Sequence, residues 1–215
     1  MKENDIKAKL ARLSDNFLLR ADRKRYDEAT DEQRKKIDAL NRMFDMYNSR
    51  NGPGPDDLHI EDVQLRVLKR KRKYPEIGDI FRLMPPNSEY LYGIVINNHV
   101  KCIGITEAIV VMIFVSKEKL LEACSRTILP DDLFIPPLIL TNLYWTKGFF
   151  ETVDRIENFH CDADYGFYRP FEDDFVNESN IKMDHRPQII DFTGVCTDIG
   201  VACSVYREMA YRDMI

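Results

Sequence analysis

The sequence predicts an α+β fold, in which a curled, mostly antiparallel β-sheet carries peripheral helices and is preceded by an N-terminal helical hairpin. Three observations lead to this fold class. Apolar residues recur at helical spacing before residue 55, and short β-branched or aromatic runs alternate with turn residues from 77 to 153. The charge balance also changes: residues 1–73 contain 19 Lys and Arg against 14 Asp and Glu, whereas residues 74–215 contain 12 against 22. We therefore predict a basic helical extension over 1–73 and an acidic α+β domain over 74–215.

Two helices are predicted in the extension. Apolar side chains at spacings of three and four from Ile6 to Leu18 indicate a first helix over residues 3–20, followed by a polar connection at 21–29. Thr30 and Gln33 then have the spacing of a capping box, whose side chains bond the free N–H groups at a helix start. Glycine and proline at residues 51–55 should end this second helix. We expect the two helices to be antiparallel and to pack on the main domain, with packing on a partner chain as the alternative.

The segment between the extension and the hairpin is less regular. Residues 58–68 alternate apolar and polar positions at Val63, Leu65 and Val67, which favours a strand, with a short helix as the alternative. Five consecutive basic residues follow, Lys69 to Lys73, and such a run can contact phosphates or act as an import signal. Because it lacks interleaved aromatic residues and precedes an acidic domain, we expect a solvated segment that balances nearby carboxylates.

The clearest hairpin signal covers residues 74–96. A strand at 80–83, a proline-containing turn at 85–88 and a return strand at 90–96 are predicted, with a second turn at 97–99. Gly93 inside the return strand predicts a bulge, a bend or the close approach of another backbone segment. The apolar, β-branched run 108–115 predicts a central strand buried on both faces, and Ser116 should cap a short helix over 117–124.

The remaining elements are shorter. After Pro136 and Pro137, which punctuate the chain, residues 138–145 predict a strand. A turn at 146–148 then leads into a strand at 149–153. Short strands are predicted at 165–168 and 188–192, and a closing helix at 201–212.

Composition indicates a cytoplasmic protein. The longest apolar run, 108–115, is less than half of the roughly 20 residues that a membrane-spanning helix needs. The N-terminal residues mix charges from the start and lack the apolar core of a secretory signal. Five cysteines, an odd number with no CxxC pair, indicate reduced thiols rather than a disulfide framework. We expect no membrane partner.

No catalytic or cofactor motif is present. The sequence lacks GxSxG, P-loop, GxGxxG and HExxH patterns, so we expect no enzyme activity and no cofactor. The densest mixture of reactive side chains is the segment from His160 to Asp164. Adjacent side chains rarely converge on one ion, and no second ligand pair accompanies them, so we expect a solvated acidic loop and no metal site.

Residues 161–178 form the candidate binding site, because carboxylates there alternate with aromatic residues. Aromatic side chains ringed by carboxylates suit a docking surface for a basic protein. An irregular edge segment with its aromatic side chains in the core explains the pattern equally well. The residues predicted to contact a partner are Asp162, Asp164, Tyr168, Glu172, Asp173, Asp174 and Glu178.

Several short motifs together resemble the immunity protein 26 family. They are residues 77–81 (IGDIF), residues 90–95 (YLYGIV) after a proline-containing turn, the apolar strand before a Ser-Lys-Glu helix, residues 134–137 (FIPP), and residues 147–149 (KGF) in a strand turn. The resemblance covers approximately residues 74–170. Members of that family usually have a tryptophan after the Lys-Gly pair, whereas this chain has Phe149 there and Trp145 before it.

The resemblance implies a bacterial cytoplasmic protein that is encoded beside a polymorphic or contact-dependent inhibition toxin. Such a protein binds and neutralises its cognate toxin and has no catalytic residues. An acidic domain without catalytic motifs agrees with inhibition of a basic toxin through complementary charge. The alternative is an SH3-like barrel that binds nucleic acid or acts as an endoribonuclease-type module, with the 69–73 run on the phosphate backbone. The acidic balance of residues 74–215 opposes that alternative, so nucleic acid is not an expected partner.

Overall fold

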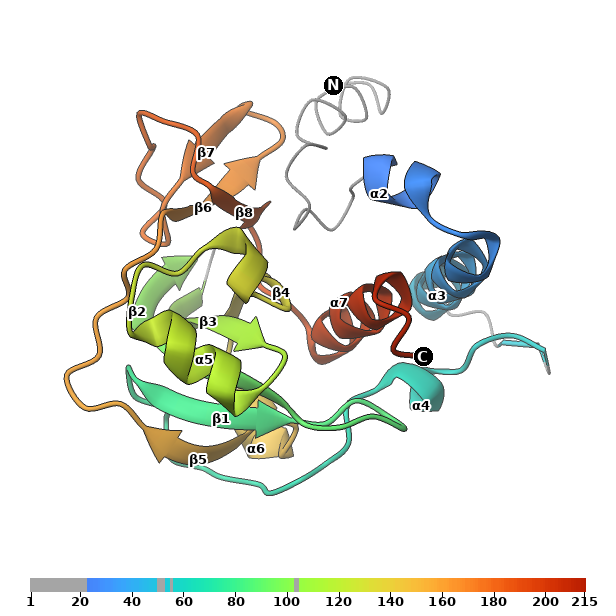
Figure 1. Ribbon diagram of the computed structural model, residues 1–215, viewed down its shortest axis with the longest axis horizontal. Helices are drawn as coiled ribbons and strands as arrows, with labels where there is room; N and C mark the ends of the chain where they lie inside the picture. Colours follow the sequence, from blue (N-terminus) through green and yellow to red (C-terminus); the bar gives the residue numbers. More distant parts are fainter. Residues whose placement is uncertain (1–22, 50–52, 55, 103–104) are drawn as a thin grey trace.

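The computed structural model describes residues 23–49, 53–54, 56–102 and 105–215, which form two β-sheets and a set of flanking helices (Figure 1). A five-stranded antiparallel sheet has the strand order β4-β3-β2-β1-β5 and is not closed into a barrel. A smaller sheet has the order β7-β6-β8, with β6 antiparallel to β7 and parallel to β8. The predicted α+β class is confirmed. The strands are β1 Asp79–Leu83, β2 Leu91–Cys102, β3 Ile105–Phe114, β4 Ile135–Leu140, β5 Glu151–Arg155, β6 Tyr165–Arg169, β7 Asp174–Val176 and β8 Ile189–Phe192.

The predicted β1–β2 hairpin is present, and its register places Phe81 opposite Gly93. A Cβ atom at Gly93 would lie 2.3 Å from the Phe81 ring and 2.8 Å from the Met112 carbonyl oxygen, so the glycine is required for close approach. The predicted turn at 97–99 is wrong, because β2 continues to Cys102 through several register shifts. Asn97 Oδ1 accepts a hydrogen bond from the His99 N–H (3.0 Å). This bond is typical of a turn, but here it lies within an irregular part of the strand.

The region after β3 follows the prediction only in part. Ser116 caps α5 (Lys117–Cys124) by accepting a hydrogen bond from the Lys119 N–H, as the sequence indicated. The strand predicted at 138–145 is correct only for residues 138–140, because the strand begins earlier, at Ile135, includes both prolines and ends at Leu140. Proline is tolerated there because β4 is an edge strand with a register irregularity. Residues from Leu143 to Lys147 form helix α6 instead, which ends at Gly148 in the left-handed conformation (φ 87°).

Three helices stand beside the main sheet on one side. Their bounds are α2 Arg23–Glu28, α3 Asp31–Ser49 and α7 Asp198–Tyr211. Thr30 and Gln33 form the predicted capping box at the start of α3, with bonds of 2.9 and 3.2 Å. The connection predicted at 21–29 is wrong in part, because it contains α2. The first predicted helix, at 3–20, lies outside the described residues, and so does the pairing of the two helices into a hairpin.

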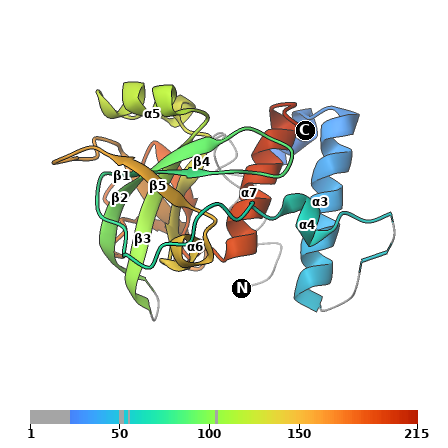
Figure 2. The same ribbon diagram turned by 90° about the horizontal axis from the view of Figure 1, so that it is seen from below.

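Helix α7 lies between the main sheet and α3 (Figures 1 and 2). Leu40 and Met43 of α3 are buried in the same core cluster as α7, whereas Phe44 and Tyr47 remain 37% and 49% exposed. Gln33 Nε2 donates to the Tyr211 carbonyl oxygen (3.1 Å). Arg25 of α2 forms an ion pair with the buried Glu208 of α7 (2.9 Å). The described part of the extension therefore packs on the C-terminal helix.

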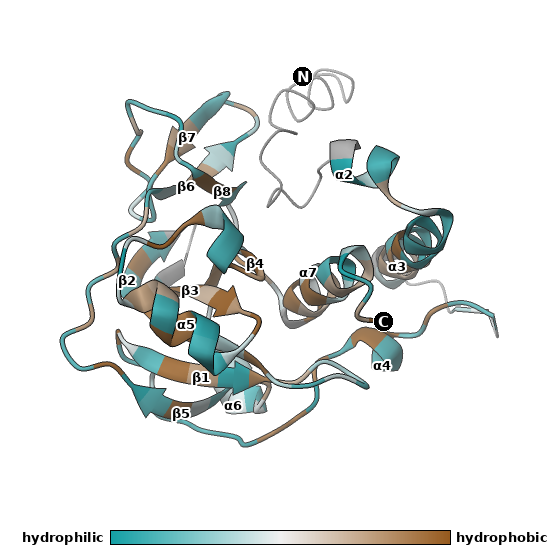
Figure 3. Ribbon diagram, in the orientation of Figure 1, coloured by the Kyte–Doolittle hydropathy of each residue, from teal (hydrophilic) through white to brown (hydrophobic). Residues whose placement is uncertain are grey.

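The main sheet has a hydrophobic core on each face. One cluster joins β1, β2 and β3 to α6, α7 and the segment 58–65, and it contains the packed rings of Phe81, Trp145 and Phe150. The second cluster joins the opposite face to α5 and to Phe167, Val176 and Ile189 of the smaller sheet. In Figure 3 the hydrophobic residues gather on the strands and on the inner side of α7. The smaller sheet and the segment 58–73 therefore lie on opposite faces of the main sheet.

The strand predicted at 58–68 is wrong. A four-residue helix, α4 (Ile60–Val63), is followed by an irregular segment in which Val63 and Leu65 are buried and Val67 is 56% exposed. Val63 and Leu65 pack in the core although this segment is not a strand, and this explains the apolar and polar alternation in the sequence. Among the residues described, none of the helices combines the length and the hydropathy needed to cross a lipid bilayer.

Candidate functional site

The candidate binding residues lie mostly on the smaller sheet, around the hairpin that joins β6 to β7. The Arg169 guanidinium donates two hydrogen bonds to the Asp174 carboxylate (2.8 and 2.7 Å) and thereby links the two strands. Asp173 occupies the left-handed region (φ 58°), where aspartate is better tolerated than most residues, and its N–H bonds the Arg169 carbonyl oxygen. The turn residues Pro170 to Asp173 are held by these bonds and project from the sheet.

The structure separates the seven predicted contact residues into an exposed pair and a supporting set. Glu172 and Asp173 are exposed at the hairpin turn, and Glu172 makes no salt bridge or hydrogen bond with any described residue. Tyr168 is only 1% exposed and donates its hydroxyl hydrogen to Asp173 Oδ1 (2.5 Å), so it supports the turn from below. Asp174 is bonded to Arg169 and lies 3.5 Å from the Lys182 ammonium group.

The other three carboxylates are tied to neighbouring segments. Asp162 accepts a hydrogen bond from the Thr127 hydroxyl (2.7 Å), and Glu178 accepts one from Asn97 Nδ2 (3.2 Å). Asp164 lies 2.9 Å from His185 Nε2 and accepts the Gln188 N–H (3.1 Å). Much of the charge that the sequence suggested for a partner is thus engaged within the protein. Across residues 161–187, seven Asp and Glu still exceed three Lys and Arg, so this region remains acidic.

The aromatic residues of the segment divide in the same way. Phe167 is fully buried, and Tyr168 packs against Phe175 at 5.4 Å between ring centroids. Phe171, in contrast, is 73% exposed at the hairpin turn, and Ile181 beyond β7 is 62% exposed. Most of these aromatic side chains are therefore packed inside the protein, and Phe171 is exposed to a possible partner.

A cavity of about 490 Å³ opens beside the hairpin turn. Its wall includes apolar side chains from both sheets, Ile139 and Phe192 among them, and the carboxylates Glu172 and Glu178. Phe171 also lines it. We define the hairpin surface as Phe171, Glu172 and Asp173 with this cavity. It offers an exposed apolar ring, two carboxylates and a recess, which are features of a protein-docking surface.

His185 is an exposed titratable group in the segment between β7 and β8. Hydrogen bonds with the carboxylates of Asp184 and, second, Asp164 raise the pKa of its imidazole above the usual value. A raised pKa means that the charged imidazole stabilises the folded state below the ordinary pKa of about 6.5 and that this stabilisation is lost as pH rises through the raised pKa.

We expect an NMR titration of the His185 ring to give a midpoint above about 6.5, the unperturbed histidine value. Asp184→Asn and Asp164→Asn should each lower that midpoint, because each removes one carboxylate partner. An unchanged midpoint in both variants would contradict this arrangement of charges.

The segment from His160 to Asp164 lines a separate cavity of about 400 Å³. Burial, the main cause, raises the pKa of the Cys161 thiol to about 12, so this thiol stays protonated and unreactive at neutral pH. Burial likewise raises the pKa of the Tyr165 hydroxyl. The described residues contain no group of three or more His, Cys, Asp or Glu side chains that could hold a metal ion.

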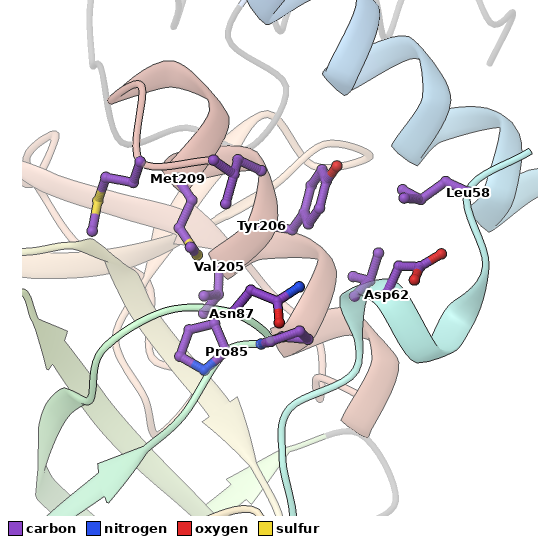
Figure 4. Close-up of a pocket in the computed structure, with 11 residues that line it drawn as sticks. Leu58, Asp62, Pro85, Asn87, Val205, Tyr206 and Met209 are labelled. Carbon is purple, nitrogen blue, oxygen red and sulfur yellow. The ribbon is translucent and has the colours of Figure 1, made fainter.

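A mainly apolar cavity of about 350 Å³ lies between the α4 region, the β1–β2 turn and α7 (Figure 4). Leu58 and Asp62 come from the α4 region, Pro85 and Asn87 from the β1–β2 turn, and Tyr206 from α7. Sequence reasoning missed this cavity because its walls come from segments far apart in the chain. No sequence motif marks this cavity, because it forms only where the α4 region, the β1–β2 turn and α7 pack together.

Comparison with known families supports the resemblance seen in the sequence. Residues 76–179 match the model of the family described as Immunity protein 26, a region that contains β1 to β7 and the turn residues Phe171, Glu172 and Asp173. Comparison with curated proteins and with solved structures found no match. The match over residues 76–179 supports the assignment of this region to the immunity protein 26 family.

Proposed function

We propose that the protein is a non-catalytic, cytoplasmic immunity protein that binds and neutralises a cognate bacterial toxin through the hairpin surface. The observation that carries the proposal is the family match over residues 76–179, within which the exposed Phe171 and Glu172 lie. Phe167 is buried in the core. Phe171, in contrast, is 73% exposed beside carboxylates on a turn held by hydrogen bonds, and such a side chain favours docking of another protein.

A basic toxin surface would complement this region, because carboxylates outnumber cations over residues 161–187. In this proposal Phe171 supplies the apolar anchor, and Glu172 and Asp173 attract the approaching partner. The cavity beside the turn receives a side chain of the toxin. The toxin belongs to a polymorphic or contact-dependent inhibition system, as the family resemblance implies. The alternative of an SH3-like barrel loses support, because the five-stranded sheet is open.

The direct test is co-expression with the polypeptide encoded by the adjacent reading frame. We expect that polypeptide to be toxic alone, to be tolerated when this protein is present, and to co-purify with it. Glu172→Lys should lower the association rate about tenfold at low salt, because rim charges act on encounter. Phe171→Ala should raise the dissociation rate about tenfold, because exposed aromatic anchors act on the bound complex.

Matched controls are available on surfaces outside the smaller sheet. Glu89→Lys changes an exposed carboxylate in the β1–β2 turn, and Leu129→Ala removes an apolar side chain that is 46% exposed near α5. Neither should alter the kinetics of binding. A complex that forms normally with both hairpin variants would show that the hairpin surface is not the contact, whereas absence of toxicity and of binding would refute the immunity function itself.

A further inference from the structure

The basic run lies in a fixed position along helix α6. The Leu68 N–H donates to the Gly148 carbonyl oxygen (2.7 Å), and the Lys71 N–H donates to the Trp145 carbonyl oxygen (2.9 Å). The two acceptors follow each other in the opposite chain direction, so the segment runs antiparallel to α6. A Cβ atom at Gly148 would lie 3.1 Å from Arg70 Cγ and from the Arg70 nitrogen, which shows how closely the segment approaches. The run is therefore part of the folded surface.

Four successive cations of this run have no anionic partner in the described part of the protein. Lys69, Arg70, Lys71 and Arg72 form no ion pair with any described residue, and only Lys73 does, with Glu76 at 2.5 Å. The expectation that the run balances nearby carboxylates therefore holds for its last residue alone. Several other arginines are paired with carboxylates, as the Arg82–Glu151 contact at 2.7 Å illustrates.

The basic run is remote from the hairpin surface. The segment that contains Leu65 contributes to the core on one face of the main sheet together with Trp145, whereas Phe167 and Val176 of the smaller sheet belong to the core on the other face. Figure 1 shows the smaller sheet and the segment between α4 and β1 on different sides of the molecule. The exposed Lys147 of α6 adds a further cation next to Gly148. The basic run and the acidic hairpin surface thus lie on opposite faces of the main sheet.

We propose that Lys69, Arg70, Lys71 and Arg72, which we name the basic strip, bind the phosphate backbone of nucleic acid. Consecutive ammonium and guanidinium groups that pair with no described carboxylate match the repeated charge of a phosphodiester chain, and guanidinium groups bond phosphate oxygens in pairs. The strip contains no aromatic side chain on which a base could stack, so binding depends on phosphates and carries no sequence preference. This proposal is independent of toxin binding, because it uses the other face of the sheet.

Salt dependence of binding measures the number of phosphates engaged. The intact protein is titrated with fluorescent mixed-sequence DNA of about 20 base pairs at salt concentrations from about 50 to 200 mM, the range over which phosphate contacts are strongly screened. Four neutralised phosphates predict a slope of log K against log salt of about −3.6, from roughly −0.9 for each phosphate in duplex DNA. Lys69→Gln with Lys71→Gln, and separately Arg70→Gln with Arg72→Gln, should each bring the slope to about −1.8.

The control is Lys35→Gln with Arg42→Gln, which removes two exposed cations from α3 and should leave the slope unchanged. Circular dichroism and thermal unfolding verify that each variant is folded, and glutamine keeps the aliphatic stem that Arg70 places over Gly148. Absence of binding at low salt, or a slope unaffected by both strip variants, would overturn the proposal. Equally tight binding of poly-glutamate would also overturn it, because the partner would then be an acidic protein.

Discussion

Trp145→Ala should lower the free energy of unfolding by about 3–5 kcal/mol, the range for removing a large aromatic side chain from a core. Trp145 is fully buried, and its ring lies 5.3 Å from Phe81 and 5.2 Å from Phe150, in edge-to-face contact with both. Its Nε1–H donates to the Thr152 hydroxyl oxygen (3.1 Å), so the same side chain fastens α6 to β5. Urea unfolding followed by far-UV circular dichroism measures the loss.

Leu143→Ala is the control for that experiment, because Leu143 begins the same helix but is 54% exposed. Its effect should stay within about 0.5 kcal/mol, the usual limit for a surface substitution. Equal losses for Leu143→Ala and Trp145→Ala would mean that helix α6 rather than the buried ring is responsible. A loss below about 1 kcal/mol for Trp145→Ala would contradict the packing of the aromatic cluster.

Gly93→Ala should destabilise the protein by about 1–3 kcal/mol or more, although alanine is an ordinary strand residue and adds one methyl group. The new Cβ would lie 2.3 Å from the edge of the Phe81 ring and 2.8 Å from the Met112 carbonyl oxygen. The ring can shift only by disturbing its stacked partner Phe150, 4.4 Å away, and the carbonyl group is fixed in the sheet. Thermal unfolding is a sufficient measurement.

A double-mutant cycle with Phe81→Leu separates the two clashes. If the ring is the main obstacle, Gly93→Ala costs less in the Phe81→Leu background than in the natural protein. The remaining cost is then due to the Met112 carbonyl oxygen, which the leucine leaves in place. Strictly additive effects would show that Phe81 and residue 93 do not interact, contrary to their paired positions in the β1–β2 hairpin.

Elements that depend on neighbouring residues were predicted well from the sequence. Ser116 and Thr30 cap their helices at the expected positions, because a capping side chain needs only a backbone N–H two or three residues away. The β1–β2 hairpin and the buried β3 strand follow from runs of apolar residues between turn residues. The strand predictions failed where the structure depends on which strand lies beside a segment or on whether the segment is at the edge of the sheet. Pro136 and Pro137 are accommodated only because β4 is at the edge of the sheet.

The smaller sheet shows the same limit for the candidate site. Its β6–β8 pairing joins residues more than 20 positions apart, and the isolated Ile139–Val195 bridge connects the two sheets. The sequence marked the acidic and aromatic segment as the candidate binding site, and its role in binding stays a prediction. The sequence alone could not show that Tyr168 is buried whereas Phe171 is exposed, because the difference depends on the conformation of the β6–β7 turn. That residues 69–72 form no ion pair with the described carboxylates likewise became apparent only from the positions of those carboxylates in the fold.

The position of helix α7 between the main sheet and α3 has a consequence for synthesis of the chain. Helix α3 ends at Ser49 and its packing partner begins at Asp198, so about 150 residues must be translated between them. At roughly 5–20 residues per second, the apolar side chains of Leu40 and Met43 wait on the order of 10 s for their cover. Residues of α3 therefore leave the ribosome long before α7 exists, and we expect their apolar side chains to be accessible to chaperones during that interval.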